Sequence, residues 1–98
     1  MNQLLDRQLP VQSGFTDKQG QYLAFIWTYG LLNGRSPAER DMQRFFGVTP
    51  PTVHQMLINL ERDGFIRRQP RLARSIELLV EPNTLPRLQP VKSSVQRY

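Results

Sequence analysis

The sequence predicts a mainly α-helical fold with one small β-hairpin, and three observations lead to this prediction. Polar residues able to cap a helix stand before three stretches whose apolar residues recur at helical spacing. About three residues join the second stretch to the third, so these two helices must cross steeply. After Gly64 the apolar period changes from helical to alternating. Together these features are typical of a three-helix winged helix-turn-helix.

The first helix is expected from Thr16 to about Leu32. Thr16–Gln19 reads as a capping box, in which the first and fourth residues satisfy each other's backbone amides. An inward face of apolar residues follows: Tyr22, Leu23, Ile26, Tyr29 and Gly30. Phe25 and Leu32 lie off this face and Trp27 lies at its edge. We therefore expect a further element or a partner to cover this extra apolar flank.

The second helix is expected from Pro37 to Phe46, with Ser36 as its N-cap and Gly47 at its end. Its inward residues are Ala38, Met42 and Phe45, and its outward residues are Arg40, Gln43 and Arg44. The third helix is expected to restart at Thr49–Pro51 and to run to Asp63, where Gly64 stops it. Its inward residues are Val53, Leu57 and Leu60, with Met56 beside them, and its outward residues are Thr52, Gln55, Asn59 and Arg62.

The alternating segment predicts a hairpin of Phe65–Gln69 and Arg74–Val80 joined by a turn at Pro70–Ala73. This segment is strongly basic, because five arginines stand between positions 62 and 74 against one acid, Asp63. Such a run either faces a polyanion or is a soluble edge that discourages aggregation. The run alone leaves both interpretations open.

We divide the chain into one folded domain, 15–80, with an N-terminal arm, 1–14, and a flexible basic tail, 81–98. The arm holds the leucines Leu4, Leu5 and Leu9 before Pro10 breaks any helical turn. The tail has three prolines and no acid after Glu81. No apolar run approaches the roughly 20 residues of a membrane span, so we expect a cytoplasmic protein that does not bind membranes.

Catalysis and metal binding are not expected. The chain has no cysteine, and its one histidine, His54, has neither an acid nor a second histidine at helical spacing. No glycine-rich loop could cradle a phosphate, and Ser93 and Ser94 lie in the tail without a fixed base. We therefore expect no enzyme, no cofactor and no metal site.

Double-stranded DNA is the expected partner. Side chains that read the major groove are short or bidentate and lie near the start of a recognition helix. The expected base-contacting residues are Thr49, Pro51, Thr52, His54 and Gln55. Gln55 can pair with adenine, and His54 can donate to guanine. The expected phosphate-contacting residues are Arg35, Arg44, Asn59, Arg71 and Arg74. On an isolated helix the same residues would be ordinary polar surface.

The order of several short motifs between Phe15 and Val80 resembles the DNA-binding domain of LexA-type repressors. The resemblance rests on Thr16-x-x-Gln19, Leu23, Phe25-Ile26, Gly34-Arg35-Ser36-Pro37, Met42, Phe46-Gly47, Pro50, Leu57, Leu60, Gly64-x-Ile66, Arg74-x-Ile76 and Leu78-Leu79. It implies a winged helix-turn-helix whose third helix enters the major groove, with the family's base-contacting positions falling on the five residues named above. The family typically has Ser, Asn, Ala and paired Glu there, so its operator sequence is not carried over.

Four departures from the family shape the expectations. The turn before Thr49 is one residue shorter. At the wing tip, Arg71–Ala73 replace the family's glycine and small residues, which implies stronger contact with the DNA backbone. In the second helix, Ala38 replaces a capping threonine, so the N-cap is expected to move back to Ser36. The family's C-terminal Ser–Lys autopeptidase domain, which also dimerises the repressors, has no counterpart in these 98 residues. Self-cleavage is therefore not expected.

The sequence thus predicts a sequence-specific DNA-binding regulator, a repressor associated with the nucleoid. The alternative is a winged-helix protein-interaction module that uses the apolar flank of the first helix; RNA binding ranks third, because no exposed aromatic platform is expected on a sheet. A weak homodimer, or a dimer formed only on DNA, is expected through that flank and the leucines of the arm.

Overall fold

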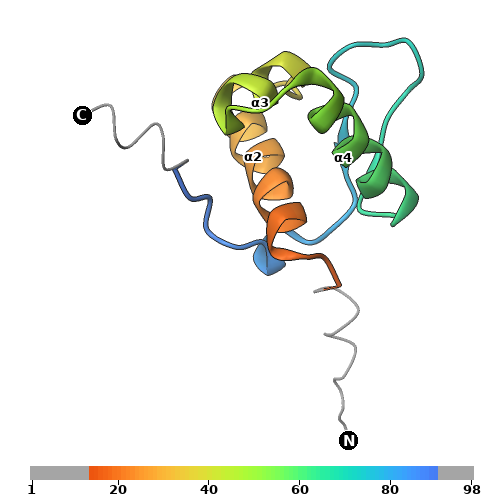
Figure 1. The fold of residues 1–98 in the computed structure, drawn as a ribbon. Helices are drawn as coiled ribbons and strands as arrows, with labels where there is room; N and C mark the ends of the chain where they lie inside the picture. Colours follow the sequence, from red (N-terminus) through yellow and green to blue (C-terminus); the bar gives the residue numbers. More distant parts are fainter. Residues whose placement is uncertain (1–13, 91–98) are drawn as a thin grey trace, which may run out of the picture.

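The computed structural model describes residues 14–90, and their elements form a winged helix-turn-helix (Figure 1). The helices are α2 (Asp17–Asn33), α3 (Glu39–Phe46) and α4 (Pro50–Arg62). A two-stranded antiparallel sheet, β2 (Ile66–Arg67) and β3 (Glu77–Leu78), follows, and a 3-10 helix, η1 (Pro82–Thr84), closes the described chain. The predicted fold class is confirmed.

Helix α2 begins with the predicted capping box. Thr16 Oγ1 accepts from the Gln19 amide at 3.1 Å, and Gln19 Oε1 accepts from the Thr16 amide at 2.9 Å. Gln19 is buried, and its Nε2 donates to Asp63 Oδ2 at 3.0 Å. Because Asp63 is the C-cap of α4, the Gln19 side chain both caps α2 and links it to the end of α4.

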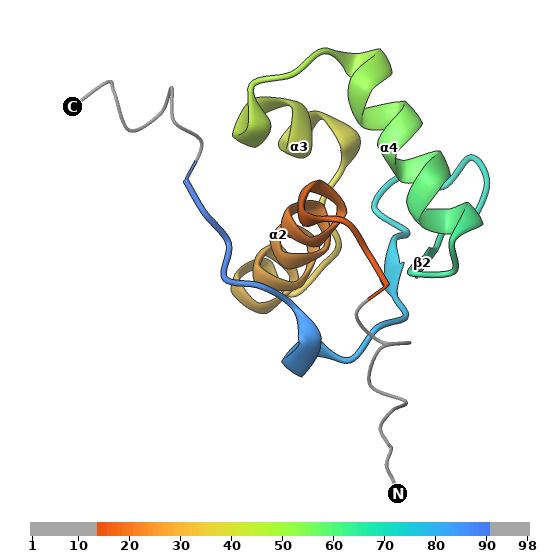
Figure 2. The same cartoon turned by 60° about the horizontal axis from the view of Figure 1, so that its bottom comes forward.

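The core forms where the apolar faces of the three helices meet the sheet (Figure 2). The core includes four side chains with no exposed surface: Leu23, Met42, Leu57 and Leu60. Ile66 of β2 is also buried and packs in the same cluster. This packing buries one face of each helix and fixes the crossing of α3 and α4, which stabilises the fold mainly through the removal of apolar surface from water.

For Phe25, the expected covering element is helix α3. Its side chain is buried, with ring centroids 4.8 Å from Phe45 and 5.7 Å from Phe46. The two aromatic residues that end α3 reach over α2 and cover it, a contact that spacing within one helix could not show. The remaining exposed flank of α2 consists of Trp27, Leu31 and Leu32.

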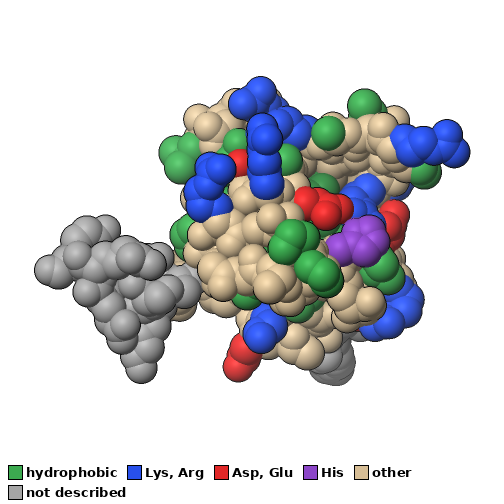
Figure 3. All heavy atoms as spheres, turned by 45° about the horizontal axis from the view of Figure 1, so that its top comes forward, with side chains coloured by type: hydrophobic (Ala, Val, Ile, Leu, Met, Phe, Trp, Pro, Cys, Tyr) green, Lys and Arg blue, Asp and Glu red, His purple; other side chains and the backbone are tan. Residues whose placement is uncertain are grey.

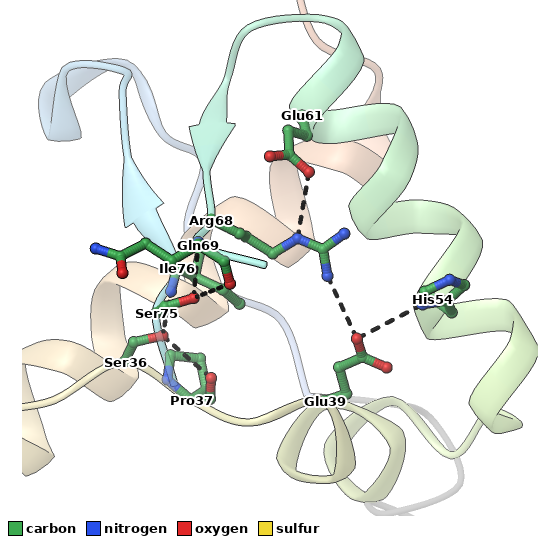
Figure 4. Close-up of polar contacts among 9 residues, drawn as sticks. All are labelled: Ser36, Pro37, Glu39, His54, Glu61, Arg68, Gln69, Ser75 and Ile76. Carbon is green, nitrogen blue, oxygen red and sulfur yellow. Dashed lines mark hydrogen bonds and ion pairs between the residues drawn. The ribbon is translucent and has the colours of Figure 1, made fainter. Parts of the chain in front are cut away.

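The start of α3 also differs from the prediction. Helix α3 begins at Glu39, and Asp41 Oδ2 accepts from the Ala38 amide at 2.8 Å. Ser36 does not cap the helix, because its Oγ accepts from the Ile76 amide of the wing at 3.2 Å and lies 3.1 Å from the Pro37 carbonyl oxygen (Figure 4). The predicted cap is therefore wrong: Ser36 joins the loop before α3 to the wing.

The wing is shorter in its strands and longer in its loop than predicted. Only Ile66↔Leu78 and Arg67↔Glu77 pair, and residues 68–76 form the loop. The loop is closed by Ser75, whose Oγ accepts from the Gln69 amide at 3.0 Å. Arg71 and Arg74 have positive φ angles of 60° and 57°, a conformation incompatible with a continued strand.

The first part of the predicted flexible tail packs against α2. Leu85 and Leu88 pack against the core. Gln21 of α2 binds the backbone on both sides of Leu88: its Oε1 accepts from the Gln89 amide at 2.8 Å and its Nε2 donates to the Arg87 carbonyl at 2.9 Å. Residues 81–90 thus differ from the expectation. The rest of the tail, 91–98, and the arm leucines Leu4, Leu5 and Leu9 lie outside the described residues. Within 14–90, no helix is long and apolar enough to cross a membrane.

Candidate nucleic-acid interface

The exposed face of α4 carries the five residues predicted to contact bases. Thr49, Pro51, Thr52, His54 and Gln55 are all exposed, whereas Val53, Leu57 and Leu60 are buried on the opposite face. Thr49 is the N-cap, and its Oγ1 lies 2.9 Å from Thr52 Oγ1. The structure therefore places the five side chains together on the first half of α4. Helix-turn-helix proteins present their base-contacting side chains at this part of the recognition helix.

Gln55 is oriented by the next turn of the helix. Its Nε2 donates to Asn59 Oδ1 at 3.0 Å, and the same oxygen accepts from Arg62 Nη1 at 3.2 Å. Arg62 in turn pairs with Asp63 at 3.2 Å. The Asn59 oxygen is therefore engaged within α4, and its amide nitrogen is the end available for a phosphate.

An ion-pair network joins α3, α4 and the wing (Figure 4). Glu39 Oε2 lies 3.3 Å from Arg68 Nη1 and 3.6 Å from His54 Nδ1, and Arg68 Nε lies 3.4 Å from Glu61 Oε1. In the view of Figure 3, acidic and basic side chains stand directly beside the histidine. Sequence reasoning missed Arg68 as a site residue, because Glu39 is 29 positions away along the chain.

Three of the predicted phosphate-contacting arginines are exposed: Arg35 after α2, Arg44 in α3 and Arg71 at the wing tip. Within residues 14–90, none of them forms an ion pair. Arg67, by contrast, pairs with Glu77 across the sheet at 2.7 Å. Part of the positive charge of the wing is thus neutralised by an acidic residue of the protein itself.

Arg74 lies elsewhere than predicted. Its Nη1 is within 3.0 Å of the Tyr29 hydroxyl, 3.2 Å of the Ser36 carbonyl oxygen and 3.2 Å of Asp41 Oδ2. These contacts turn the guanidinium toward α2 and α3, so Arg74 anchors the base of the wing and is not presented to a phosphate. The hydrogen bond with Tyr29 raises the pKa of Arg74, and the Ala38 amide and then Arg74 lower the pKa of Asp41.

No group of three metal-ligating side chains occurs among residues 14–90. The comparisons with known proteins agree with the geometry. The family described as the LexA DNA binding domain matches residues 12–75, which span all three helices and β2. The chain belongs to this family.

LexA repressors of three bacteria show the extent of the likeness. That of Thermosipho africanus is 40% identical over 70 residues, which cover 71% of this chain and 35% of the relative. That of Thermosipho melanesiensis is 40% identical over 80 residues, or 82% and 39% of the two chains. That of Clostridioides difficile is 40% identical over 65 residues, or 65% and 31%. The matched LexA region thus spans about a third of each relative.

Proposed function

We propose that this chain binds double-stranded DNA sequence-specifically and acts as a repressor, with α4 in the major groove. The main support for this proposal is the exposure of the five candidate base-contacting residues at the start of α4: Thr49, Pro51, Thr52, His54 and Gln55. A threonine hydroxyl, an amide and an imidazole supply donors and acceptors, and methyl and proline carbons suit the thymine methyl group. The membership of the LexA DNA-binding family and the names of its relatives, LexA repressors, support the same function.

Phosphate contacts would come from the exposed cations that flank these five residues. Arg71 extends the wing tip, Arg35 precedes α3, and Arg44 lies in the last turn of α3. Asn59 can add an amide donor. Such contacts fix the register of the helix on the duplex but carry no sequence information themselves.

Selection of bound sites from random duplex DNA tests the proposal directly. We expect enrichment of one short motif, and an affinity that falls with salt at a log–log slope of about −0.9 for each neutralised phosphate. A pool that stays random after repeated rounds would contradict sequence-specific binding. A motif whose binding is insensitive to salt would contradict the phosphate contacts.

The exposed flank of α2 supports a second candidate function, a protein-interaction module. Trp27, Leu31 and Leu32 are 38%, 65% and 79% exposed, and Trp27 and Leu31 line a shallow groove beside β3. Clustered apolar side chains of this kind mark interaction surfaces. Binding through this flank would barely respond to salt, which distinguishes it from DNA binding.

We further propose that two copies pair weakly through this flank, or pair only on DNA, and that the protein acts in the cytoplasm at the nucleoid. A single winged helix covers about 600–1,000 Å² on DNA, which limits its affinity at physiological salt. Two copies on adjacent half-sites would bind more tightly.

A further inference from the structure

One carboxylate oxygen connects a candidate base reader to the wing. Oε2 of Glu39, the first residue of α3, faces both His54 Nδ1 at 3.6 Å and Arg68 Nη1 at 3.3 Å (Figure 4). The Arg68 side chain is 20% exposed, and it also reaches Glu61. Arg68 therefore fixes the carboxylate that stands behind His54.

This arrangement favours one of the two ring nitrogens of His54 as the acceptor. Nδ1 lies 3.6 Å from a carboxylate oxygen, so in the neutral ring the negative charge favours the hydrogen on Nδ1 and leaves Nε2 as an acceptor. The side chain is 59% exposed on the outward face of α4, so Nε2 is free to reach a base edge if α4 lies in the major groove. Acceptors in the major groove face amino groups, N6 of adenine or N4 of cytosine, rather than the N7 and O6 of guanine. For His54, this tautomer favours adenine or cytosine over the guanine that the sequence suggested.

Arg68 contributes position and charge balance. A free Glu39 carboxylate has several rotamers, and an uncompensated negative charge beside the recognition helix would repel phosphates. With Arg68 between Glu39 and Glu61, the carboxylate is held by a guanidinium from a third element. Among residues 14–90, Glu39 pairs with His54, and neither Glu39 nor Glu61 forms an ion pair or hydrogen bond with the other four candidate base-contacting residues.

We propose that Glu39, held by Arg68, is a positioning residue that sets the orientation and tautomer of His54, so that Nε2 accepts from the amino group of adenine or cytosine. This inference rests on the proposed function, because it requires α4 to lie in the major groove.

The test compares base preferences at every position of the selected site. Wild-type protein should prefer adenine or cytosine at one position, and His54→Ala should reduce that preference about fivefold or more. Glu39→Ala should cause the same loss at the same position, and the double variant should lose no more than either single one. The matched control is Glu61→Ala, which removes the other partner of Arg68 without touching His54, and it should leave the preferences unchanged.

Several results would overturn the inference: guanine or thymine at the position sensitive to His54→Ala, an even loss at all positions for Glu39→Ala, or equal effects of Glu39→Ala and Glu61→Ala. If thermal melting shows that Glu39→Ala does not fold, Arg68→Ala replaces it and should weaken the preference at that position alone. Failure of the proposed function looks different, because wild-type protein would then select no motif. A motif that His54→Ala leaves unchanged overturns only this inference.

Discussion

Gln55 is the exposed residue of α4 best suited to pair with an adenine, and its amide is already oriented by Asn59. We expect Gln55→Ala to relax specificity more than it weakens non-specific binding. A good bidentate pair provides about 1–3 kcal/mol of discrimination. Affinities for the selected site and for a scrambled duplex measure the effect. Equal losses on the two duplexes would remove Gln55 from the readers.

Asp41 should make the stability of the domain depend on pH in acid. Its carboxylate accepts from the Ala38 amide and pairs with Arg74, which lower its pKa in the folded state. A lowered pKa gives stability that is present above the unfolded-state pKa, about 3.9, and is lost as pH falls through the folded-state pKa.

We therefore expect the melting temperature to fall below about pH 4, and Asp41→Asn to lower it at neutral pH while flattening this fall. Thermal melts from pH 7 to pH 2 measure both effects. Asp63, whose pKa is lowered by Gln19 and Arg62, is unchanged in the variant, so part of the acid dependence should remain. Parallel curves for variant and wild type would contradict the role of Asp41.

At the scale of elements, the wing places Arg71 and Arg74 in different environments, although the sequence predicts phosphate contact for both. Arg71 is exposed at the tip, whereas Arg74 is bound at the base to Tyr29, Ser36 and Asp41. We expect Arg71→Ala to weaken binding to all duplexes and to reduce the salt slope by about one. Arg74→Ala should lower the melting temperature instead. Affinities over a salt series, together with melting curves, test the separation. A change of slope for Arg74→Ala alone would reverse the assignment.

The elements that the sequence predicted well depend on neighbours close along the chain. The capping box of Thr16 and Gln19 involves residues three apart, and the inward face of α4 follows from its helical period. The predictions that were wrong depend on distant partners. Ser36 accepts from Ile76, 40 positions away, and Gln21 holds Gln89, 68 positions away. Neither contact has a local signal. The five base readers are exposed as predicted, but their contacts with bases stay a prediction.

At the scale of the whole molecule, the exposed flank of α2 should control assembly. We expect Leu31→Ser with Leu32→Ser to leave folding intact, because both side chains are largely exposed, and to abolish any preference for paired half-sites. Light scattering, with footprinting on single and paired half-sites about one helical turn apart, measures this. The control is Leu79→Ser, an exposed leucine that follows β3 and lies outside the flank of α2. Equal affinity per site on both duplexes for wild-type protein would refute pairing.

The left-handed backbone of Arg71 is unfavourable for the free protein, whereas its exposed charge is proposed to strengthen DNA binding. A non-glycine residue in this conformation costs roughly 1–2 kcal/mol. Arg74 has a similar φ angle but gains three hydrogen bonds, whereas Arg71 forms no side-chain hydrogen bond or ion pair within residues 14–90. Glycine adopts the conformation freely. We therefore expect Arg71→Gly to raise the melting temperature of the free protein and, at the same time, to weaken its binding to DNA. A decrease in both the melting temperature and the DNA affinity would contradict this prediction and would mean that Arg71 stabilises its own loop. If they diverge, Arg71 lowers the stability of the free protein while its charge strengthens binding to DNA.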